Sequence, residues 1–190
     1  MERVIFGKEQ KTLDKKTPLY DRHLSLKGKM VSFGGYVMPV QYGKGILAEH
    51  MAVRTKMGLF DVSHMGEVLL EGKGALASLN HLMSNDYTNL PIEKVRYSTM
   101  LNEKGGVIDD LIVYHLGEDR YMVVVNAATH DKDAAHMKAN LLPDTKFTDI
   151  SDETGLLSLQ GPLTKTFLPT LVEGGELPEK YYSEKEHVII

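Results

Sequence analysis

The sequence predicts an α+β fold, with antiparallel sheets flanked by helices. The strongest observation is a pair of strand-like segments, residues 107–116 and 121–126, joined by a short polar linker that contains Gly117. A second observation is the order of the expected elements, which runs strand, helix, strands, helix, strand. This order is typical of folds in which helices cover one face of a mainly antiparallel sheet, leaving the other face for a ligand or a second domain.

Three patterns describe the N-terminal part. Thr17 suits the N-cap of a helix, and Pro18 suits its first position. Residues 33–39 contain two glycines and a proline among large apolar side chains, which predicts a loop that packs inward or lines a pocket. Residues 46–56 carry apolar side chains at helical spacing, which predicts an amphipathic helix ended by Gly58.

The expected elements from residue 67 onward follow a regular order. Apolar runs predict strands, and apolar residues at helical spacing predict helices. Thr129 is the expected N-cap of a helix whose first turn holds Asp131 and Asp133, where the helix dipole favours acids. We expect strands at 67–71 and 95–101, the two hairpin strands, strands at 147–150 and 156–160, and helices at 74–83, at 130–141 and briefly after Leu163.

Strand alternation assigns the side chains of the hairpin to two faces. If residues 117–119 form the loop, Asp110 lies opposite Asn126 and Ile112 lies opposite Val124. An acid, an amide and a tyrosine among apolar neighbours would suit a planar, apolar ligand with amide-like edges. The alternative is an exposed face whose Asp and Asn are simply solvated. One face carries Asp110, Ile112 and Tyr114, and the other carries Asp109, Leu111 and Val113.

Composition excludes several classes of protein. The chain has 190 residues, enough for a core in one or two domains. Its formal net charge of -4 gives no electrostatic footprint for nucleic acid or an anionic membrane. It has no cysteine, which excludes disulfides, thiolate metal sites and cysteine nucleophiles, and we expect no bound metal. Without a signal peptide or an apolar run of roughly 20 residues, a cytoplasmic protein is the expectation.

Asp61 and His64 lie three residues apart and could form a catalytic dyad. No nucleophile at a recognisable spacing accompanies them, because Ser63 is too common a residue type to count. The alternative is a histidine that satisfies a local backbone group in a turn, so a serine hydrolase is poorly supported.

Several segments together resemble one family, the aminomethyltransferase (T protein) of the glycine cleavage system. The resemblance starts at Thr17, continues to the end of the chain, and corresponds to the N-terminal half of the family. It depends on an ordered series of motifs. They are residues 17–20, 34–39, 52–54, 58–66 (Gly-Leu-Phe-Asp-Val-Ser-His-Met-Gly), 97–98, 105–114 (Gly-Gly-Val-Ile-Asp-Asp-Leu-Ile-Val-Tyr), 124–127 and 160–162.

The resemblance implies a three-domain cloverleaf around a folate, of which this chain would hold the folate-binding domains without the C-terminal part. Residues 59–150 would form an inserted α+β domain. Residues 17–58 and 151–190 would form one discontinuous, incomplete domain, preceded by a flexible arm at 1–16. The apolar residues 187–190 read as a strand, so we expect a chain that is cut short and inactive by itself.

The resemblance also implies an activity and its residues. The enzyme would take the aminomethyl group from the lipoyl arm of the H protein, release ammonia and hand the methylene to tetrahydrofolate. Asp110 matches the catalytic acid, which would hydrogen-bond the reacting folate amine or favour its positive charge. The expected folate-binding residues are Met65, Leu69, Tyr97, Asp110, Ile112, Tyr114, Val124, Asn126, Tyr181 and Tyr182.

Two other functions remain open at this point. The first is a folate-binding protein of the same fold without transfer activity, such as the relatives that assist iron–sulfur assembly. Those proteins often lose parts of the Asp110 and Asn126 pattern that this chain keeps. The second is the folate domain of a dimethylglycine or sarcosine dehydrogenase, which would carry an upstream flavin-binding Gly-rich motif; none precedes Thr17 here.

Overall fold

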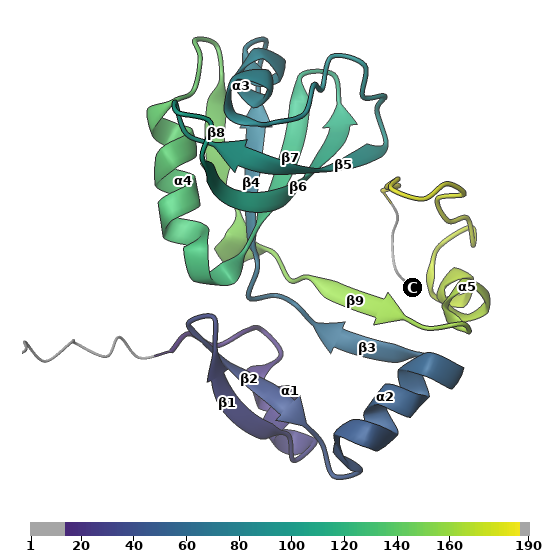
Figure 1. Ribbon diagram of the computed structural model, residues 1–190. Helices are drawn as coiled ribbons and strands as arrows, with labels where there is room; N and C mark the ends of the chain where they lie inside the picture. Colours follow the sequence, from purple (N-terminus) through teal and green to yellow (C-terminus); the bar gives the residue numbers. More distant parts are fainter. Residues whose placement is uncertain (1–13, 187–190) are drawn as a thin grey trace, which may run out of the picture.

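The computed structural model describes residues 14–186, and it contains helices and antiparallel strands, the α+β class that the sequence predicts (Figure 1). The α-helices are α1 (Tyr20–Ser25), α2 (Gly45–Thr55), α3 (Ala75–Leu82), α4 (His130–Ala139) and α5 (Thr164–Phe167). The 3-10 helices are η1 (Ala127–Thr129), η2 (Ser151–Glu153) and η3 (Leu168–Leu171). The strands are β1 (Lys29–Phe33), β2 (Tyr36–Gln41), β3 (Gly58–Asp61), β4 (Gly66–Glu71), β5 (Lys94–Leu101), β6 (Val107–Gly117), β7 (Arg120–Val125), β8 (Lys146–Asp149) and β9 (Leu157–Gln160).

Five strands form the main sheet, in the order β5-β6-β7-β4-β8, and every neighbouring pair is antiparallel. In the β6–β7 hairpin, Ile112 pairs with Val124, as the sequence predicts. The turn is shorter than expected, because Gly117 itself pairs with Arg120. A register shift between His115 and Gly117 compensates for this difference, so the predicted pairing further along the hairpin is preserved.

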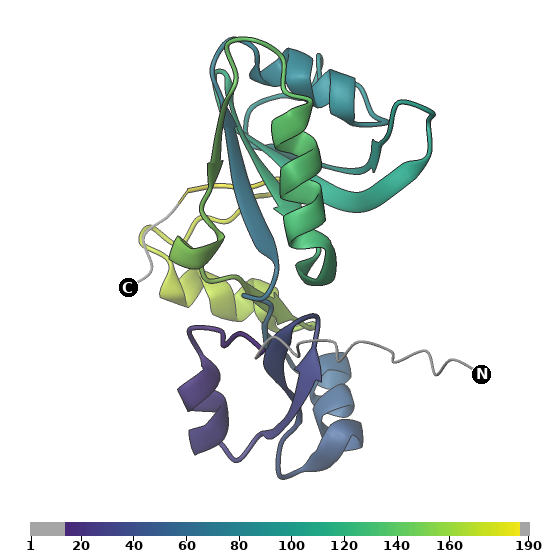
Figure 2. The ribbon, with the colours of Figure 1, turned by 90° about the vertical axis from the view of Figure 1, so that its left-hand side faces the viewer.

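The core of the chain lies between this sheet and the helices α3 and α4, which cover the same face of it (Figure 2). The strands supply alternate residues to the core, since only every second side chain of a strand points to a given face. Asp109, Leu111 and Val113 share the helix-covered face, as predicted. The fully buried apolar side chains include Val68, Leu70, Leu79, Tyr87, Met100, Val113, Val123, Val125 and Met137.

Residues 33–39 form a β-hairpin, so the prediction of a loop is wrong. Gly34 and Gly35 alone make the turn between β1 and β2, with φ of 58° and 82°. A two-residue turn that matches the twist of a β-hairpin needs positive φ at both central residues. Glycine adopts positive φ without strain. Pro39 sits within β2, where a two-stranded sheet tolerates its missing N–H.

The first helix starts later than the sequence suggests. Leu19, not Thr17, is the N-cap of α1, and it makes no side-chain cap hydrogen bond. The Thr17 hydroxyl instead donates to Asp61 Oδ2 at 2.6 Å. A tertiary hydrogen bond to a buried carboxylate therefore replaces the local cap.

The helix α2 ends at Thr55, and Gly58 begins β3 instead of ending the helix. The apolar side chains that predicted an amphipathic helix are largely exposed: Leu47 is 82% exposed and Ile46 is 56% exposed. The helix α4 begins after Thr129, but the Thr129 side chain makes no cap hydrogen bond. It donates to Asp109 on β6.

The short strands β3 and β9 pair with each other, although the whole main sheet lies between them in the sequence (Figure 1). The sequence analysis did not predict β3. Leu59 is 61% exposed and Leu157 is 51% exposed, so this sheet keeps apolar surface in the described chain.

The two ends of the described chain are held by backbone hydrogen bonds. Lys15 N donates to Gly35 O at 2.8 Å, and Glu184 N donates to Glu93 O at 3.0 Å. Residues 1–13 of the expected arm and the expected strand at 187–190 lie outside the described residues.

Candidate functional site

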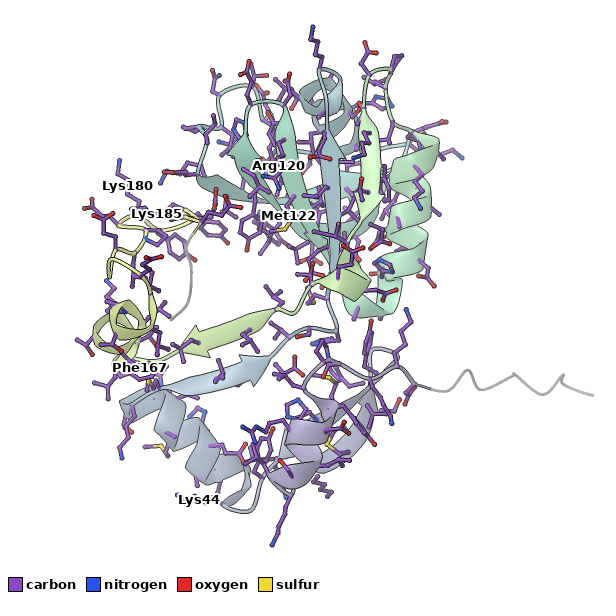
Figure 3. All side chains as sticks on the ribbon, turned by 180° about the vertical axis from the view of Figure 1, so that it is seen from behind. Lys44, Arg120, Met122, Phe167, Lys180 and Lys185 are labelled. Atoms are coloured by element: carbon purple, nitrogen blue, oxygen red, sulfur yellow. The ribbon has the colours of Figure 1, made fainter. Side chains whose placement is uncertain are left out.

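One face of the main sheet is not covered by α3 or α4, and the predicted site residues gather on it. The strand registers place two rows of side chains there. One row contains Tyr97, Ile112, Val124 and Glu67, each paired with the next across β5, β6, β7 and β4. The neighbouring row contains Val95, Tyr114, Met122 and Leu69. Figure 3 views the molecule from this side, with Met122 labelled on the sheet.

The carboxylate of Asp110 is held at one end of this face. Its Oδ2 accepts a hydrogen bond from the Tyr97 hydroxyl at 2.9 Å, and its Oδ1 accepts one from Asn126 Nδ2 at 3.2 Å. Asn126 Nδ2 also lies 3.0 Å from the backbone oxygen of Asp110. The structure thus places Asp110 beside Asn126, as the strand alternation predicts.

The tyrosine phenols on this face are affected by their acidic neighbours. The hydrogen bond to Asp110 raises the pKa of Tyr97. Burial raises the pKa of Tyr114, and the negative charges of Glu184 and Glu67 raise it further. Both phenols therefore stay protonated at neutral pH and are available as hydrogen-bond donors.

The segment that carries Tyr181 and Tyr182 returns to the sheet along the free edge of β5. Val95 N donates to Tyr182 O at 3.0 Å. In Figure 3 the labelled Lys185 of this segment lies beside the sheet. The two tyrosine rings meet edge to face, with centroids 4.5 Å apart. Tyr181 is 87% exposed and Tyr182 is 40% exposed.

Met65 lies one residue before Gly66, which pairs with Val125, the neighbour of Asn126. It precedes β4 and lines a cavity of about 880 Å³ together with Gly34, His64 and Ser151. This cavity lies between the β1–β2 turn and the start of α4, and its lining includes neither Asp110 nor Asn126. Leu69, by contrast, is part of the second row, opposite Met122.

Glu67 is a residue of this face that the sequence analysis missed. Its side chain is buried, and neither carboxyl oxygen has a hydrogen-bond partner among the described residues. Burial raises its pKa to about 7, the charge of Asp149 adds to this effect, and His130 opposes it. Alternation could have found Glu67, because it shares its face with Leu69.

Asp61 and His64 do not form the dyad that the sequence leaves open. Asp61 Oδ2 lies 2.8 Å from His23 Nε2 and also accepts from Thr17. His64 Nδ1 is buried without a hydrogen-bond partner in the described part of the chain, and its ring packs against Phe33 and Tyr36. Asp61 therefore joins α1 to β3, and His64 is a packing residue beside the hairpin turn.

Within residues 14–186, no group of three or more His, Asp or Glu side chains is placed to hold a metal ion. In the same part of the chain, no helix has the length and apolar character needed to cross a membrane.

Comparisons with known proteins agree with the motif series and the fold. The chain is 48% identical over 160 residues to an aminomethyltransferase of Thermus thermophilus, covering 84% of this chain and 46% of that protein. It is 45% identical over 177 residues to the aminomethyltransferase of Staphylococcus carnosus, covering 93% of this chain and 48% of that protein. The chain thus spans about half the length of these curated relatives.

The fold matches a solved structure as well. The crystal structure of glycine cleavage system aminomethyltransferase T from Bartonella henselae superposes with a TM-score of 0.80 and 37% sequence identity, covering 84% of this chain and 44% of that one. The family model of the GCVT N-terminal domain matches residues 19–187. The chain therefore belongs to the GCVT N-terminal domain family.

Proposed function

We propose that the protein containing this chain is a tetrahydrofolate-dependent aminomethyltransferase of glycine cleavage. It would accept the aminomethyl group from the lipoyl arm of the H protein, release ammonia and transfer the methylene to tetrahydrofolate. Membership of the GCVT N-terminal domain family supports this proposal, as do the names of the relatives. The proposal concerns the whole protein, with the cytoplasm as the proposed location of the reaction.

The observation that carries the proposal is the Asp110 carboxylate, held by Tyr97 and Asn126 at the end of an apolar sheet face. Tetrahydrofolate combines flat rings, amide-like edges and amines. The described face offers matching chemistry, because Ile112, Val124 and Leu69 give apolar contact and Asn126 gives an amide. The residues present therefore fit such a substrate.

Asp110 is the proposed catalytic residue. A carboxylate there would accept a hydrogen bond from the reacting folate amine and would favour positive charge that develops on that amine. The hydrogen bonds from Tyr97 and Asn126 fix the position of the carboxylate before substrate arrives. Such fixed geometry is what makes an electrostatic contribution effective in catalysis.

The remaining proposed folate-binding residues take lesser roles. Tyr114, Tyr181 and Tyr182 would contribute ring surface, and Met65 would contribute apolar contact together with Leu69. The domain division is also part of the proposal: residues 59–150 as an inserted domain within 17–58 and 151–190. The pairing of β3 with β9 supports it, because these strands come directly before and after the main-sheet strands in the sequence.

The decisive experiment is isotope transfer from aminomethylated H protein to tetrahydrofolate. It should be run on the full-length gene product and on the 190-residue chain, and we expect transfer with the former alone. Folate binding without transfer by the full-length protein would favour the alternative, a non-catalytic folate-binding protein of the same fold. A full-length protein that neither binds folate nor transfers the methylene would contradict the proposal.

A further inference from the structure

Two residues between β7 and α4 occupy helix N-cap positions without capping the helix. Asn126 is the N-cap of η1 and Thr129 is the N-cap of α4, and neither makes a side-chain cap hydrogen bond. Asparagine and threonine normally stabilise a helix from this position. Both side chains donate instead to the carboxylate of Asp109 on β6. The proposed reaction does not use Asp109 directly, so this convergence of donors needs an explanation of its own.

Asp109 is an acceptor surrounded by donors. Its Oδ1 accepts from Asn126 Nδ2 at 3.1 Å and from Asp110 N at 2.9 Å, and its Oδ2 accepts from the Thr129 hydroxyl. Burial alone would raise the pKa of Asp109, but the hydrogen bonds around it, led by the one from Thr129, outweigh burial and lower the pKa. An ionised carboxylate carries no proton, so it can only hold donors in place.

The orientation of the Asn126 amide follows from its acceptors. Besides Asp109 Oδ1, its Nδ2 lies 3.0 Å from the backbone oxygen of Asp110 and 3.2 Å from Asp110 Oδ1. None of these three oxygens carries a proton, so the nitrogen of the amide and not its oxygen must face them. Asp110 is exposed, whereas the bond from Asn126 to Asp109 is partly buried. Asp109 is therefore the partner that anchors the amide to the body of the sheet.

We propose that Asp109 and Thr129 are positioning residues for the reaction, which hold the Asn126 amide and the Asp110 backbone so that the Asp110 carboxylate keeps one place. Thr129 fixes the Asp109 carboxylate, and one oxygen of that carboxylate binds both Asn126 and the backbone N–H of Asp110. Asn126 in turn donates to the Asp110 carboxylate. The start of α4 is thus connected to the open face of the sheet. This inference rests on the catalytic role proposed for Asp110.

Two substitutions at Asp109 separate its role as an acceptor from its shape. Asp109→Ala removes both oxygens, whereas Asp109→Asn keeps one oxygen that can accept from Asn126. In the full-length gene product, Asp109→Ala should lower kcat about tenfold, the effect of losing one hydrogen bond to a charged group. Asp109→Asn should keep at least about a third of the wild-type kcat. The KM for tetrahydrofolate should change little in both variants, because the apolar contacts of the open face are unchanged.

Thr129 offers a conservative pair of variants. Thr129→Val removes the hydroxyl with little change in shape and should lower kcat about three- to tenfold, whereas Thr129→Ser keeps the hydroxyl and should stay near the wild-type value. Thr166→Val is the matched control. The Thr166 hydroxyl donates to the backbone oxygen three residues earlier, as that of Thr129 does, and has no side-chain partner among residues 14–186.

A double-mutant cycle tests the order of the connection. Because Thr129 acts through Asp109, Thr129→Val should cause no further loss of kcat in the Asp109→Ala background. Two independent contributions would instead multiply, and their combined loss would be the product of the separate losses.

Nuclear magnetic resonance tests the same connection without any folate. In full-length protein with labelled asparagine side chains, the Asn126 amide resonances should shift in Asp109→Ala and in Thr129→Val. They should keep their positions in Thr129→Ser and Thr166→Val. If Asp109→Ala does not fold, the comparison of Thr129→Val with Thr129→Ser decides the question by itself.

Three results would overturn the inference: a wild-type kcat for Asp109→Ala or Thr129→Val, an equal loss for Thr129→Val and Thr129→Ser, or Asn126 resonances that ignore both sites. Independent losses in the double-mutant cycle would also contradict it. A failure of the proposed function has a different signature. In that case Asp110→Asn would keep full activity or the wild type would have none, while the Asn126 resonances would still respond to Asp109→Ala and Thr129→Val.

Discussion

Asp109 and Asp110 are neighbours in the chain, and their carboxylates share one donor, Asn126 Nδ2, while each also accepts from a hydroxyl of its own. Asp110 accepts from Tyr97 on the open face, and Asp109 accepts from Thr129 at the start of α4. The Asn126 amide lies between them, 3.1 Å from Asp109 Oδ1 and 3.2 Å from Asp110 Oδ1. The alternation of a single strand therefore separates two adjacent acids into different environments.

The first prediction concerns Asp110→Asn, which removes the charge while keeping nearly the same shape. In the full-length gene product, turnover should fall by about 10² or more, as expected for losing an acid–base or electrostatic group. Tetrahydrofolate binding should remain largely intact, because the apolar contacts of Ile112 and Val124 are unchanged. Steady-state kinetics and calorimetry measure the two effects separately.

Two control variants accompany this substitution. Asp109→Asn should reduce turnover much less, since Asp109 acts only through Asn126 and the Asp110 backbone. Asp21→Asn changes an exposed acid on α1 and should have no effect on turnover. Equal losses for Asp109→Asn and Asp110→Asn would contradict the assignment, as would a loss of binding with no loss of rate.

Tyr97→Phe tests the hydrogen bond on the other side of Asp110. The substitution removes a donor that lies 2.9 Å from Asp110 Oδ2 and keeps the ring. Because Tyr97 is about half exposed, water can replace the lost donor, and kcat should fall by only about three- to tenfold. A loss as large as that of Asp110→Asn would show that the phenol itself takes part in the reaction.

The open face could be predicted from the sequence because it depends on local patterns. Alternation along 107–116 and a short linker are enough to place Asp110 beside Asn126 and Ile112 opposite Val124. The helices α3 and α4 were also predictable, since their apolar spacing is local. Their exact bounds differ from the predicted ones by a few residues.

Most of the errors have one physical cause, which is that the residues concerned have partners far away in the sequence. Thr17 does not cap a helix because Asp61 accepts its hydroxyl, and β3 exists only because β9 pairs with it. The burial of Glu67 likewise depends on packing from several elements. The β1–β2 hairpin was missed for a different reason, because Pro39 reads as a loop residue although it lies in β2.

Glu67→Gln should change how stability depends on pH. Burial raises the pKa of Glu67 from 4.5 to about 7 in the native state. The native protein then holds a proton that the unfolded chain releases, so its free energy of unfolding falls as pH rises through this window. The part of the unfolding free energy that comes from this proton on Glu67 is fully present below pH 4.5 and lost above about pH 7. It amounts to at most about 3 kcal/mol.

Urea unfolding of both proteins near pH 5 and near pH 8 measures this effect. Glutamine stays neutral at both pH values, so the unfolding free energy of the variant should depend less on pH than that of the wild type. Relative to the wild type, the variant should therefore be more stable at pH 8 than at pH 5. Parallel curves for the wild type and the variant would mean that Glu67 is ionised in the native state throughout.

Leu79→Ala tests where the core lies. Leu79 on α3 is fully buried against the sheet, and truncating a buried leucine costs about 2–5 kcal/mol of unfolding free energy. Leu47→Ala on α2 is the matched control, because Leu47 is 82% exposed and its loss should stay within about 0.5 kcal/mol. Similar losses at both positions would show that α2 is packed against something in solution.

Tetrahydrofolate should bind weakly or not at all to the 190-residue chain by itself. A small-molecule site buries most of its ligand, about 70–90% of the surface, whereas the described face leaves Tyr97 47% exposed and Tyr181 87% exposed. The relatives are about twice as long as the chain, so further residues are available in them to enclose a ligand. Calorimetry on this chain, with the full-length gene product as the positive control, should therefore give no tight binding, and methylene transfer should be undetectable. Tight binding to the isolated chain would mean that the row from Tyr97 to Glu67 with Asp110 and Asn126 is sufficient to hold the folate, and that any enclosure serves the transfer step alone.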